Sequence, residues 1–274
     1  MQVGFIGTGS MGSILLEAFI HSGALSPSQI IAYNRTRAKV ESLAERHAGL
    51  LIAPSNADVA RAAKLVMLCV KPLDYQEAIG QFANELTPEH ILVTITSPVK
   101  LEQLESLVPC PVIRLIPSIT NAALSGTTLL EFGHGVTEQL RSQILTLFSQ
   151  ISRPVEVEET FLRVAADLSS CGPAFVSYLL QQMIEAATKE TGISEQAATY
   201  LTTQMIIGFA ELVKKDLFSL QTLEQRVCVP GGITGEGLIP LKQSIPGVFN
   251  QVFMRTQQKF AQDCHEVSLH LAPK

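Results

Sequence analysis

The chain has 274 residues, of which 46% are hydrophobic and 6% aromatic, and it contains no tryptophan. This length is enough for two domains, and the composition is typical of an α/β protein with a sizeable core. The net charge is −5 and the chain has no basic block, which argues against nucleic acid as a main partner.

The first half of the chain alternates short apolar runs, which predict strands, with helical patterns such as residues 11–21 and 37–47. Near-continuous apolar strands that alternate with helices indicate an α/β fold, with a parallel sheet covered on both faces. We therefore expect an N-terminal Rossmann-type domain over residues 1–157. Its strands are predicted at residues 3–6, 30–33, 65–70, 91–95, 112–116 and 127–132, with a last short strand at 155–157.

A glycine-rich turn follows the first predicted strand and leads into a helix pattern. It fits Gly-x-Gly-x-x-Gly in the strand–turn–helix–strand context that a dinucleotide-binding motif requires. The glycines permit a tight turn, a close approach of the pyrophosphate and close packing of helix on strand. The helix N-terminus then offers free N–H groups to the phosphates. The cofactor residues predicted here are Gly7, Thr8, Gly9, Ser10, Met11 and Gly12.

The end of the second predicted strand favours NADP over NAD. Enzymes that use NAD place Asp or Glu there to bind the ribose 2′-hydroxyl. Here the chain has Asn34, Arg35 and Thr36, without a carboxylate. The planar guanidinium of Arg35 suits a 2′-phosphate, and its two neighbours add neutral hydrogen bonds. We predict NADP as the cofactor, with NAD as the alternative; an ordinary surface role for Arg35 stays open.

Lys71 and Pro72 follow the apolar run 65–70, at the edge of the sheet where open α/β folds bind their ligands. A lysine before a rigid proline is expected to contact the cofactor or to neutralise an acidic substrate. Its position alone is also consistent with an exposed lysine that ends a strand.

From residue 158 to 274 the pattern is helical, which predicts an all-α domain. Several of its helices are apolar on more than one face, and such helices must be buried. Because a domain this small offers few places to bury them, we predict a homodimer through these helices, with a larger oligomer as an extension. A compact monomeric bundle is the alternative. The helices are predicted at residues 159–169, 174–190, 194–215, 220–228 and 247–271.

A second glycine cluster, at residues 229–238, lies between two of these helices. Gly231 and Gly232, followed by Thr234 near a helix start, would present backbone N–H groups and a hydroxyl. Such a cradle suits a substrate carboxylate. The alternative is that Thr234 only caps the helix. The sequence shows no acid–base motif, so in an enzyme the cofactor would supply the hydride and the protein would position the substrate.

Together these motifs resemble the pyrroline-5-carboxylate reductase family over essentially the whole chain. The resemblance is carried by residues 7–12, 70–72, 114–117, 171–175 and, most specifically, 230–234. It implies a Rossmann domain, a helical domain that intertwines with a second subunit, and reduction of 1-pyrroline-5-carboxylate to proline with NAD(P)H. It also implies that Thr234 hydrogen-bonds the imine nitrogen. The implied substrate residues are Gly231, Gly232, Ile233 and Thr234, and the implied cofactor residues are Asn34, Arg35, Thr36, Asn56, Val70, Lys71, Pro72 and Ser97.

The chain departs from the family pattern at four places. Val229 stands where the family has serine, Arg226 where it has asparagine, Ser97-Pro98 where it has Ala-Gly, and residues 117–120 where it has Pro-Asn-Thr-Pro. The combination of residues 95–99 with residues 117–121 resembles a divergent branch of this family. Val229 removes a hydroxyl that could bind a carboxylate, and a hydrogen bond to a charged group is worth about 1.5–3 kcal/mol. The leading hypothesis is an NADP-dependent imine reductase. The alternatives are a cofactor-binding regulatory protein and a β-hydroxyacid dehydrogenase, which is disfavoured because residues 170–184 contain no lysine.

Other classes of site and location are disfavoured by the sequence. The N-terminus lacks a signal-peptide pattern, and no apolar run reaches membrane-spanning length. Five widely spaced cysteines and six histidines form no disulfide framework or metal motif. We therefore expect a cytoplasmic protein without a metal, and without nucleic-acid or membrane partners.

Overall fold

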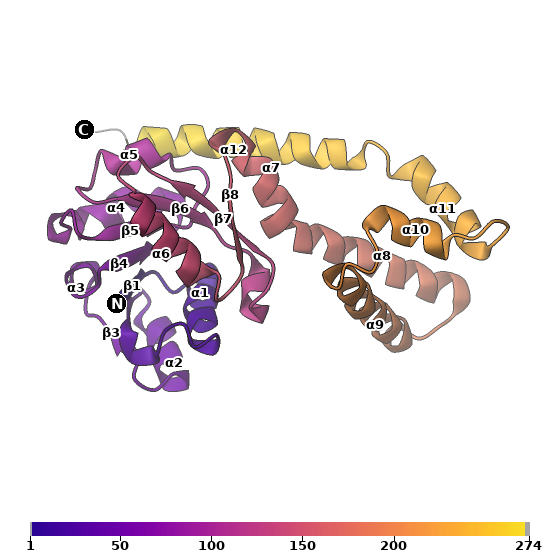
Figure 1. Cartoon of the computed structure of the whole chain (residues 1–274), viewed down its shortest axis with the longest axis horizontal. Coiled ribbons are helices and arrows are strands. Elements are labelled where there is room, and N and C mark those ends of the chain that lie inside the picture. Colours follow the sequence, from indigo (N-terminus) through magenta and orange to yellow (C-terminus); the bar gives the residue numbers. More distant parts are fainter. Residues whose placement is uncertain (1, 272–274) are drawn as a thin grey trace. The chain divides into compact units, whose positions relative to one another are not determined.

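The computed structural model describes residues 2–271 and divides the chain into two compact units (Figure 1). The first unit contains the residues up to Pro173 and those from Arg255 onward, and the second unit is Ala174–Met254. Helix α7 (Glu159–Ala166) lies in the first unit, where Leu162 packs against the sheet residues Ile116 and Leu129. The predicted boundary between residues 157 and 158 stays a prediction.

The first unit is built on an eight-stranded sheet with the order β3-β2-β1-β4-β5-β6-β7-β8. The predicted parallel sheet is confirmed for every neighbouring pair except β6 and β7, which run antiparallel. The link between these two strands, residues 117–126, is too short for the crossover that a parallel pair needs. The strands are β1 (Val3–Ile6), β2 (Ile30–Tyr33), β3 (Leu51–Ile52), β4 (Leu65–Leu68), β5 (Ile91–Thr94), β6 (Val112–Ile116), β7 (Thr127–Phe132) and β8 (Arg153–Glu156).

Helices cover both faces of this sheet, because successive strand residues point to opposite sides. Val3 and Phe5 of β1 belong to one apolar cluster, and Ile6 belongs to the other. Helices α1, α2 and α6 bury their apolar sides in the first cluster, and α3, α4, α5 and the end of α12 in the second. These helices are α1 (Ser10–His21), α2 (Arg37–Arg46), α3 (Asn56–Ala62), α4 (Tyr75–Gly80), α5 (Leu101–Glu105), α6 (Glu138–Phe148) and α12 (Val248–Leu271).

The strand order reverses direction at β1. The chain builds β2 and β3 on one side of β1 and then crosses to place β4 on the other side. Such a switch point leaves a crevice beyond the carboxyl ends of the two central strands, which is where doubly wound sheets bind their ligands. A ligand site is therefore expected among the residues that follow β1, β2 and β4.

The second unit is entirely helical and has almost no core of its own. Of residues 174–254, all of which the structure describes, only Ala198 is buried. Large apolar side chains are exposed instead, among them Tyr178, Leu201 and Met205. Among residues 2–271, no helix is long and apolar enough to cross a membrane. Besides the start of α12, the unit contains α8 (Gly172–Thr191, from residue 174), α9 (Glu195–Lys214), α10 (Leu220–Val227) and α11 (Ile233–Ser244).

Candidate functional site

The glycine-rich turn between β1 and α1 is shaped by contacts that only glycine permits. Gly7 has φ +95°, in the left-handed region, and its N–H donates to the Tyr33 carbonyl at 2.8 Å. A Cβ on Gly7 would lie 2.8 Å from the Cys69 carbonyl oxygen, and a Cβ on Gly12 would lie 2.3 Å from the Gly7 carbonyl oxygen. The turn thus lies where α1 meets β1, β2 and the end of β4. A side chain at Gly7 or Gly12 would find no room there.

Gly9 differs from these two glycines, because a Cβ there would meet nothing within 4 Å. Its bare backbone faces open space at the edge of a pocket. A dinucleotide site needs such a place, where the pyrophosphate can approach the main chain near a helix N-terminus. Gly9 is also the N-cap residue of α1, so the unpaired N–H groups of the first helical turn follow directly. The turn therefore fits a dinucleotide.

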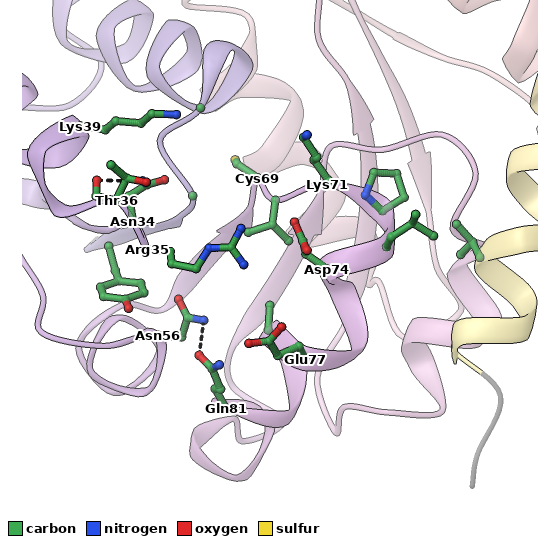
Figure 2. Close-up of a pocket in the computed structure, with 18 of the residues that line it drawn as sticks. Asn34, Arg35, Thr36, Lys39, Asn56, Cys69, Lys71, Asp74, Glu77 and Gln81 are labelled. Carbon is green, nitrogen blue, oxygen red and sulfur yellow. Dashed lines mark hydrogen bonds between the residues drawn. The ribbon is translucent and has the colours of Figure 1, made fainter.

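The pocket has a volume of about 680 Å³ and lies beyond the carboxyl ends of β1, β2 and β4 (Figure 2). It brings together nine of the cofactor residues proposed from the sequence: Gly7, Gly9, Asn34, Arg35, Thr36, Asn56, Val70, Lys71 and Pro72. The other residues that line it are Tyr33, Lys39, Cys69, Leu73, Asp74, Glu77, Ala78, Gln81, Lys259, Asp263, Glu266 and Val267.

Asn34 joins the glycine-rich turn to the end of β2. Its side-chain oxygen accepts the Thr8 N–H at 3.0 Å, and its side-chain nitrogen donates to the Thr36 carbonyl at 3.0 Å (Figure 2). Both ends of the amide are thus used to shape the backbone of the site. The structure gives Asn34 a role in building this part of the pocket, in addition to the direct cofactor contact that the sequence suggested.

Two cations follow β2 without a carboxylate between them. Arg35 extends into the middle of the pocket, whereas Lys39, one turn into α2, lies beside Thr36 (Figure 2). Within residues 2–271 no ion pair or hydrogen bond is recorded for either cationic group, and both residues are exposed. Lys39 was not predicted from the sequence. Its position in the sequence could have indicated a role in the pocket, because the first turn of a helix that follows β2 lies at the same end of the sheet as Arg35.

Two buried polar atoms near the pocket have no hydrogen-bond partner in residues 2–271. They are Thr8 Oγ1, in the glycine-rich turn, and Asn56 Oδ1, at the start of α3. Thr8 lines a smaller hollow of about 340 Å³ between α1 and α2, which shares Lys39 with the main pocket. Buried polar groups in native proteins are almost always hydrogen-bonded, so a ligand or water is expected to satisfy these two.

Lys71 and Pro72 lead from β4 into a short 3-10 turn, Pro72–Asp74, at the opposite wall of the pocket. Asp74 and Glu77 are acidic residues of this wall (Figure 2), and the last turns of α12 add Asp263 and Glu266. The pocket therefore has a cationic side after β2, whereas its opposite side combines these four carboxylates with Lys71 and with Lys259, which forms an ion pair with Asp263.

Two titratable groups under the pocket are held neutral by burial. Burial raises the pKa of the Cys69 thiol and the pKa of the Tyr75 hydroxyl well above their ordinary values. Tyr75 Oη lies 2.6 Å from Thr94 Oγ1 and donates within this pair or to the Leu68 carbonyl. Neither group is suited to act as a nucleophile or base at neutral pH. Within residues 2–271, no group of three or more His, Cys, Asp or Glu side chains is arranged to bind a metal.

Five of the proposed cofactor residues do not line the pocket. Ser97 lies in the loop after β5, and Thr8, Ser10, Met11 and Gly12 belong to the turn and the start of α1 behind it. Near Ser97 the buried Arg114 donates to the Val99 carbonyl and forms an ion pair with Glu131 at 2.7 Å. Arg114, which contributed to the family resemblance, therefore joins the loop after β5 to Glu131 on β7.

The second glycine cluster lies in the helical unit. Gly231 has φ +73° and Gly232 is the N-cap residue of α11. The helix begins at Ile233, so the alternative that Thr234 caps it is wrong. Thr234 is exposed, and within residues 2–271 no partner is recorded for its hydroxyl. Val229 packs against the N-cap, with Cγ2 2.9 Å from a Cβ built on Gly232, and Arg226 is exposed at the end of α10.

Two family models match separate parts of the chain. Residues 2–98 match the family model described as NADP oxidoreductase coenzyme F420-dependent, and residues 159–264 match the model described as pyrroline-5-carboxylate reductase dimerisation. The fold and these matches define an NADP-type oxidoreductase with a Rossmann sheet and a helical region of the dimerisation type. NADP, the predicted cofactor, is thus the cofactor of the matching family.

Relatives over the full length define the family more closely. ComE operon protein 4 of Bacillus subtilis is 42% identical over 97% of this chain and 98% of its own. Pyrroline-5-carboxylate reductase 3 of the same organism is 28% identical over 94% of this chain and 95% of its own. The chain belongs to the pyrroline-5-carboxylate reductase family, in the divergent branch that contains ComE operon protein 4.

Solved structures agree with this fold. Pyrroline carboxylate reductase of Plasmodium falciparum, with NADP bound, has a TM-score of 0.81 at 23% identity and covers 99% of this chain and 98% of its own. A pyrroline-5-carboxylate reductase from Coxiella burnetii has a TM-score of 0.83 at 23% identity, with 97% and 98% covered. At this identity the likeness concerns the fold alone.

Proposed function

We propose that this chain is an NADP-dependent imine reductase that converts 1-pyrroline-5-carboxylate, or a close relative, to proline or its analogue. The observation that carries the proposal is the pocket beyond β1, β2 and β4. It combines an open backbone at Gly9 with two cations after β2, Arg35 and Lys39, and no carboxylate at the position that NAD enzymes use. Membership of the family supports the type of reaction.

In this proposal the chain binds and orients while NADPH, when bound, supplies the hydride. Arg35 and Lys39 bind the 2′-phosphate, and the backbone around Gly9 takes the pyrophosphate. The resemblance assigns the carboxylate of the substrate to the N–H groups of Gly231, Gly232, Ile233 and Thr234, and its imine nitrogen to the Thr234 hydroxyl. A protonated imine needs no strong acid from the protein in order to accept the hydride.

We also propose that the chain works as a homodimer through its helical unit, because a second copy would cover the large apolar side chains that this unit exposes.

A second candidate function is a cofactor-binding regulatory protein with weak or no turnover. It is favoured by Val229, whose apolar side chain packs against Gly232, the N-cap residue of α11, and brings no hydroxyl that could bind a carboxylate. ComE operon protein 4, the relative at 42% identity, is named for an operon and not for a reaction.

The five cysteines are all free, which suits the reducing cytoplasm that we propose as the location.

Turnover separates the two candidates. NADPH oxidation is followed with 1-pyrroline-5-carboxylate for the native protein, for Thr234→Ala and for the control Thr146→Ala on the exposed side of α6. We expect turnover that falls at least about tenfold in Thr234→Ala and is unchanged in the control. NADPH binding without turnover would support the regulatory candidate, and full activity in Thr234→Ala would remove Thr234 from the site.

A further inference from the structure

Two fully buried hydroxyl groups meet under the pocket. Tyr75 is the first residue of α4 and Thr94 is the last residue of β5, and both are 0% exposed. Tyr75 Oη lies 2.6 Å from Thr94 Oγ1, and it also lies 3.2 Å from the carbonyl oxygen of Leu68, the last residue of β4. The pair therefore lies where the neighbouring strands β4 and β5 end.

One direction of hydrogen bonding satisfies all of these groups. The Thr96 N–H donates to Thr94 Oγ1 at 3.4 Å, and the Leu68 carbonyl can only accept. The Thr94 hydroxyl then donates to Tyr75 Oη, and the Tyr75 hydroxyl donates to Leu68. Burial raises the pKa of the Tyr75 hydroxyl, so this donor keeps its proton at neutral pH. The result is a chain of hydrogen bonds from the loop after β5 to the end of β4.

The Tyr75 hydroxyl closes the loop that follows β4. This loop, residues 69–74, connects Leu68 to Tyr75, and the hydrogen bond joins its two ends. All six of its residues line the pocket, and Lys71 and Asp74 are labelled in Figure 2. A hydrogen bond from one buried side chain thus restricts the conformation of one wall of the pocket.

The contact with Thr94 extends this restraint to the loop after β5. That loop contains Thr96, whose N–H is bound by the Thr94 hydroxyl, and Ser97, which was predicted to contact the cofactor. Because β5 pairs with β4 in parallel, the two loops leave the same end of the sheet as neighbours. Tyr75 and Thr94 therefore hold one loop in place with respect to the other.

The position of these loops indicates which half of a dinucleotide they meet. A dinucleotide extends across the switch point of a doubly wound sheet, so its two halves lie on opposite sides of that point. Strand β2 lies on one side of β1, and β4 and β5 lie on the other. With the 2′-phosphate at Arg35 and Lys39, after β2, the nicotinamide half lies beyond β4 and β5.

We propose that Tyr75 and Thr94 are positioning residues: their buried hydroxyl pair holds the loops after β4 and β5 in the arrangement that receives the nicotinamide half of NADPH. This inference rests on the proposed function, because it assumes that NADPH occupies the pocket. Without the pair the loops gain other arrangements, and the apparent affinity falls with the fraction of molecules whose loops are ready to bind. Binding of the adenosine half, on the other side of β1, does not depend on the pair.

Calorimetric titration with two ligands tests the proposal. NADPH occupies both halves of the site, whereas adenosine 2′-monophosphate occupies only the adenosine half. Tyr75→Phe and Thr94→Val each remove one hydroxyl and nearly keep the size of the side chain. We expect each variant to bind NADPH about three- to tenfold more weakly and adenosine 2′-monophosphate as the native protein does. The double variant should lose less than the product of the two single losses, because both residues serve one chain of hydrogen bonds.

Two further variants separate this role from a general loss of stability. Thr94→Ser keeps the hydroxyl and loses a methyl group, so it should bind NADPH as the native protein does. Ser152→Ala removes the hydroxyl of a matched buried pair outside the pocket, in which Ser152 Oγ lies 2.7 Å from Thr128 Oγ1 and 3.2 Å from the Phe148 carbonyl oxygen. It should lower the unfolding temperature about as much as Tyr75→Phe and leave NADPH affinity unchanged. Thermal unfolding without ligand identifies the folded variants, and either Tyr75→Phe or Thr94→Val is enough for the comparison.

The proposal is overturned if Tyr75→Phe and Thr94→Val keep the native affinity for NADPH, or if they weaken the binding of both ligands equally. It is also overturned if Thr94→Ser or Ser152→Ala loses as much NADPH affinity as Thr94→Val, because stability and not the hydroxyl pair would then determine the affinity. A native protein that does not bind NADPH would refute the proposed function itself. Native binding that the variants leave unchanged would refute only this inference.

Discussion

In the turn after β1, an added methyl group would have different effects at two glycines: on Gly12 it would affect stability, and on Gly9 it would affect ligand binding. A methyl group on Gly12 would lie 2.3 Å from the Gly7 carbonyl oxygen, whereas one on Gly9 would meet no atom within 4 Å. Gly9 also has φ −73°, which alanine adopts without strain. The two positions therefore form a matched pair in one short turn.

We predict that Gly12→Ala destabilises the fold by about 1–3 kcal/mol, since helix α1 must move away from the turn. Gly9→Ala should leave the free energy of unfolding within about 0.5 kcal/mol of the native value. It should nevertheless weaken NADPH binding about tenfold or more, because the methyl group occupies the approach of the pyrophosphate. Urea unfolding and NADPH titration measure the two effects. Equal stability loss in both variants would contradict this account of the turn.

The cations after β2 give a prediction on cofactor choice. Arg35→Ala and Lys39→Ala should each weaken NADPH binding by about ten- to a hundredfold, since each removes a charged partner of the 2′-phosphate. NADH, which lacks this phosphate, should bind the variants as it binds the native protein. Calorimetric titration with both cofactors measures the difference. An equal loss for NADPH and NADH would show that these side chains serve the common part of the cofactor.

Residues of the pocket could be predicted where a sequence motif determines the backbone geometry. The order of glycines placed Gly7 and Gly9 at the pocket, and the missing carboxylate after β2 pointed to Arg35. Lys39 was missed, although its place in the first turn of the helix after β2 was an available signal. Gln81 was missed because its place in the pocket depends on how α4 lies beside α3, which does not follow from spacing along the chain.

Among the elements, the link between α7 and α8 contains a buried ionic cluster. The two helices are joined by a π-helical segment, Asp167–Cys171, and the Asp167 side chain is fully buried. Asp167 accepts hydrogen bonds from Arg163 Nη2 at 2.8 Å and from Thr256 Oγ1 at 2.6 Å. Since Thr256 lies on α12, the cluster ties α12 to α7 within the first unit.

We predict that Asp167→Ala destabilises the protein by about 3–5 kcal/mol, because Arg163 would be left largely buried without its counter-ion. The control Glu41→Gln removes one partner of the exposed pair with Arg37 and should change stability far less. Denaturant unfolding of both variants provides the measurement. Similar small effects in the two variants would mean that the cluster does not hold α12 in place.

The order of the helices and strands could largely be predicted from the sequence, with three exceptions. Runs of apolar residues identified β1, β2, β6 and β7 with their bounds, but the two-residue strand β3 is too short to give a pattern. The antiparallel pairing of β7 depends on its connection and not on its composition. The π-helical segment Asp167–Cys171 was not predicted, since one helix was expected to end at residue 169. Ser170 Oγ in this segment donates to the Pro117 carbonyl, a tertiary contact that spacing along the chain does not reveal.

For the whole molecule, the helical unit without a core leads to a prediction on assembly. Leu201 and Met205 are one turn apart on α9 and are 58% and 46% exposed. We predict that the native chain is a dimer in solution and that Leu201→Glu combined with Met205→Glu shifts it to the monomer. The control Gln181→Glu with Gln182→Glu adds the same charge at exposed polar positions of α8 and should remain dimeric. Light scattering after gel filtration gives the mass, and a monomeric native chain would contradict the prediction.

The central claim is that the pocket beyond β1, β2 and β4 binds NADP(H) and recognises its 2′-phosphate. The most direct measurement is a calorimetric titration of the native protein with NADPH and with NADH under the same conditions. The account predicts that NADPH binds at least about tenfold more tightly, because only NADPH brings a phosphate to Arg35 and Lys39. Equal affinities for the two cofactors, or binding of neither, would contradict it.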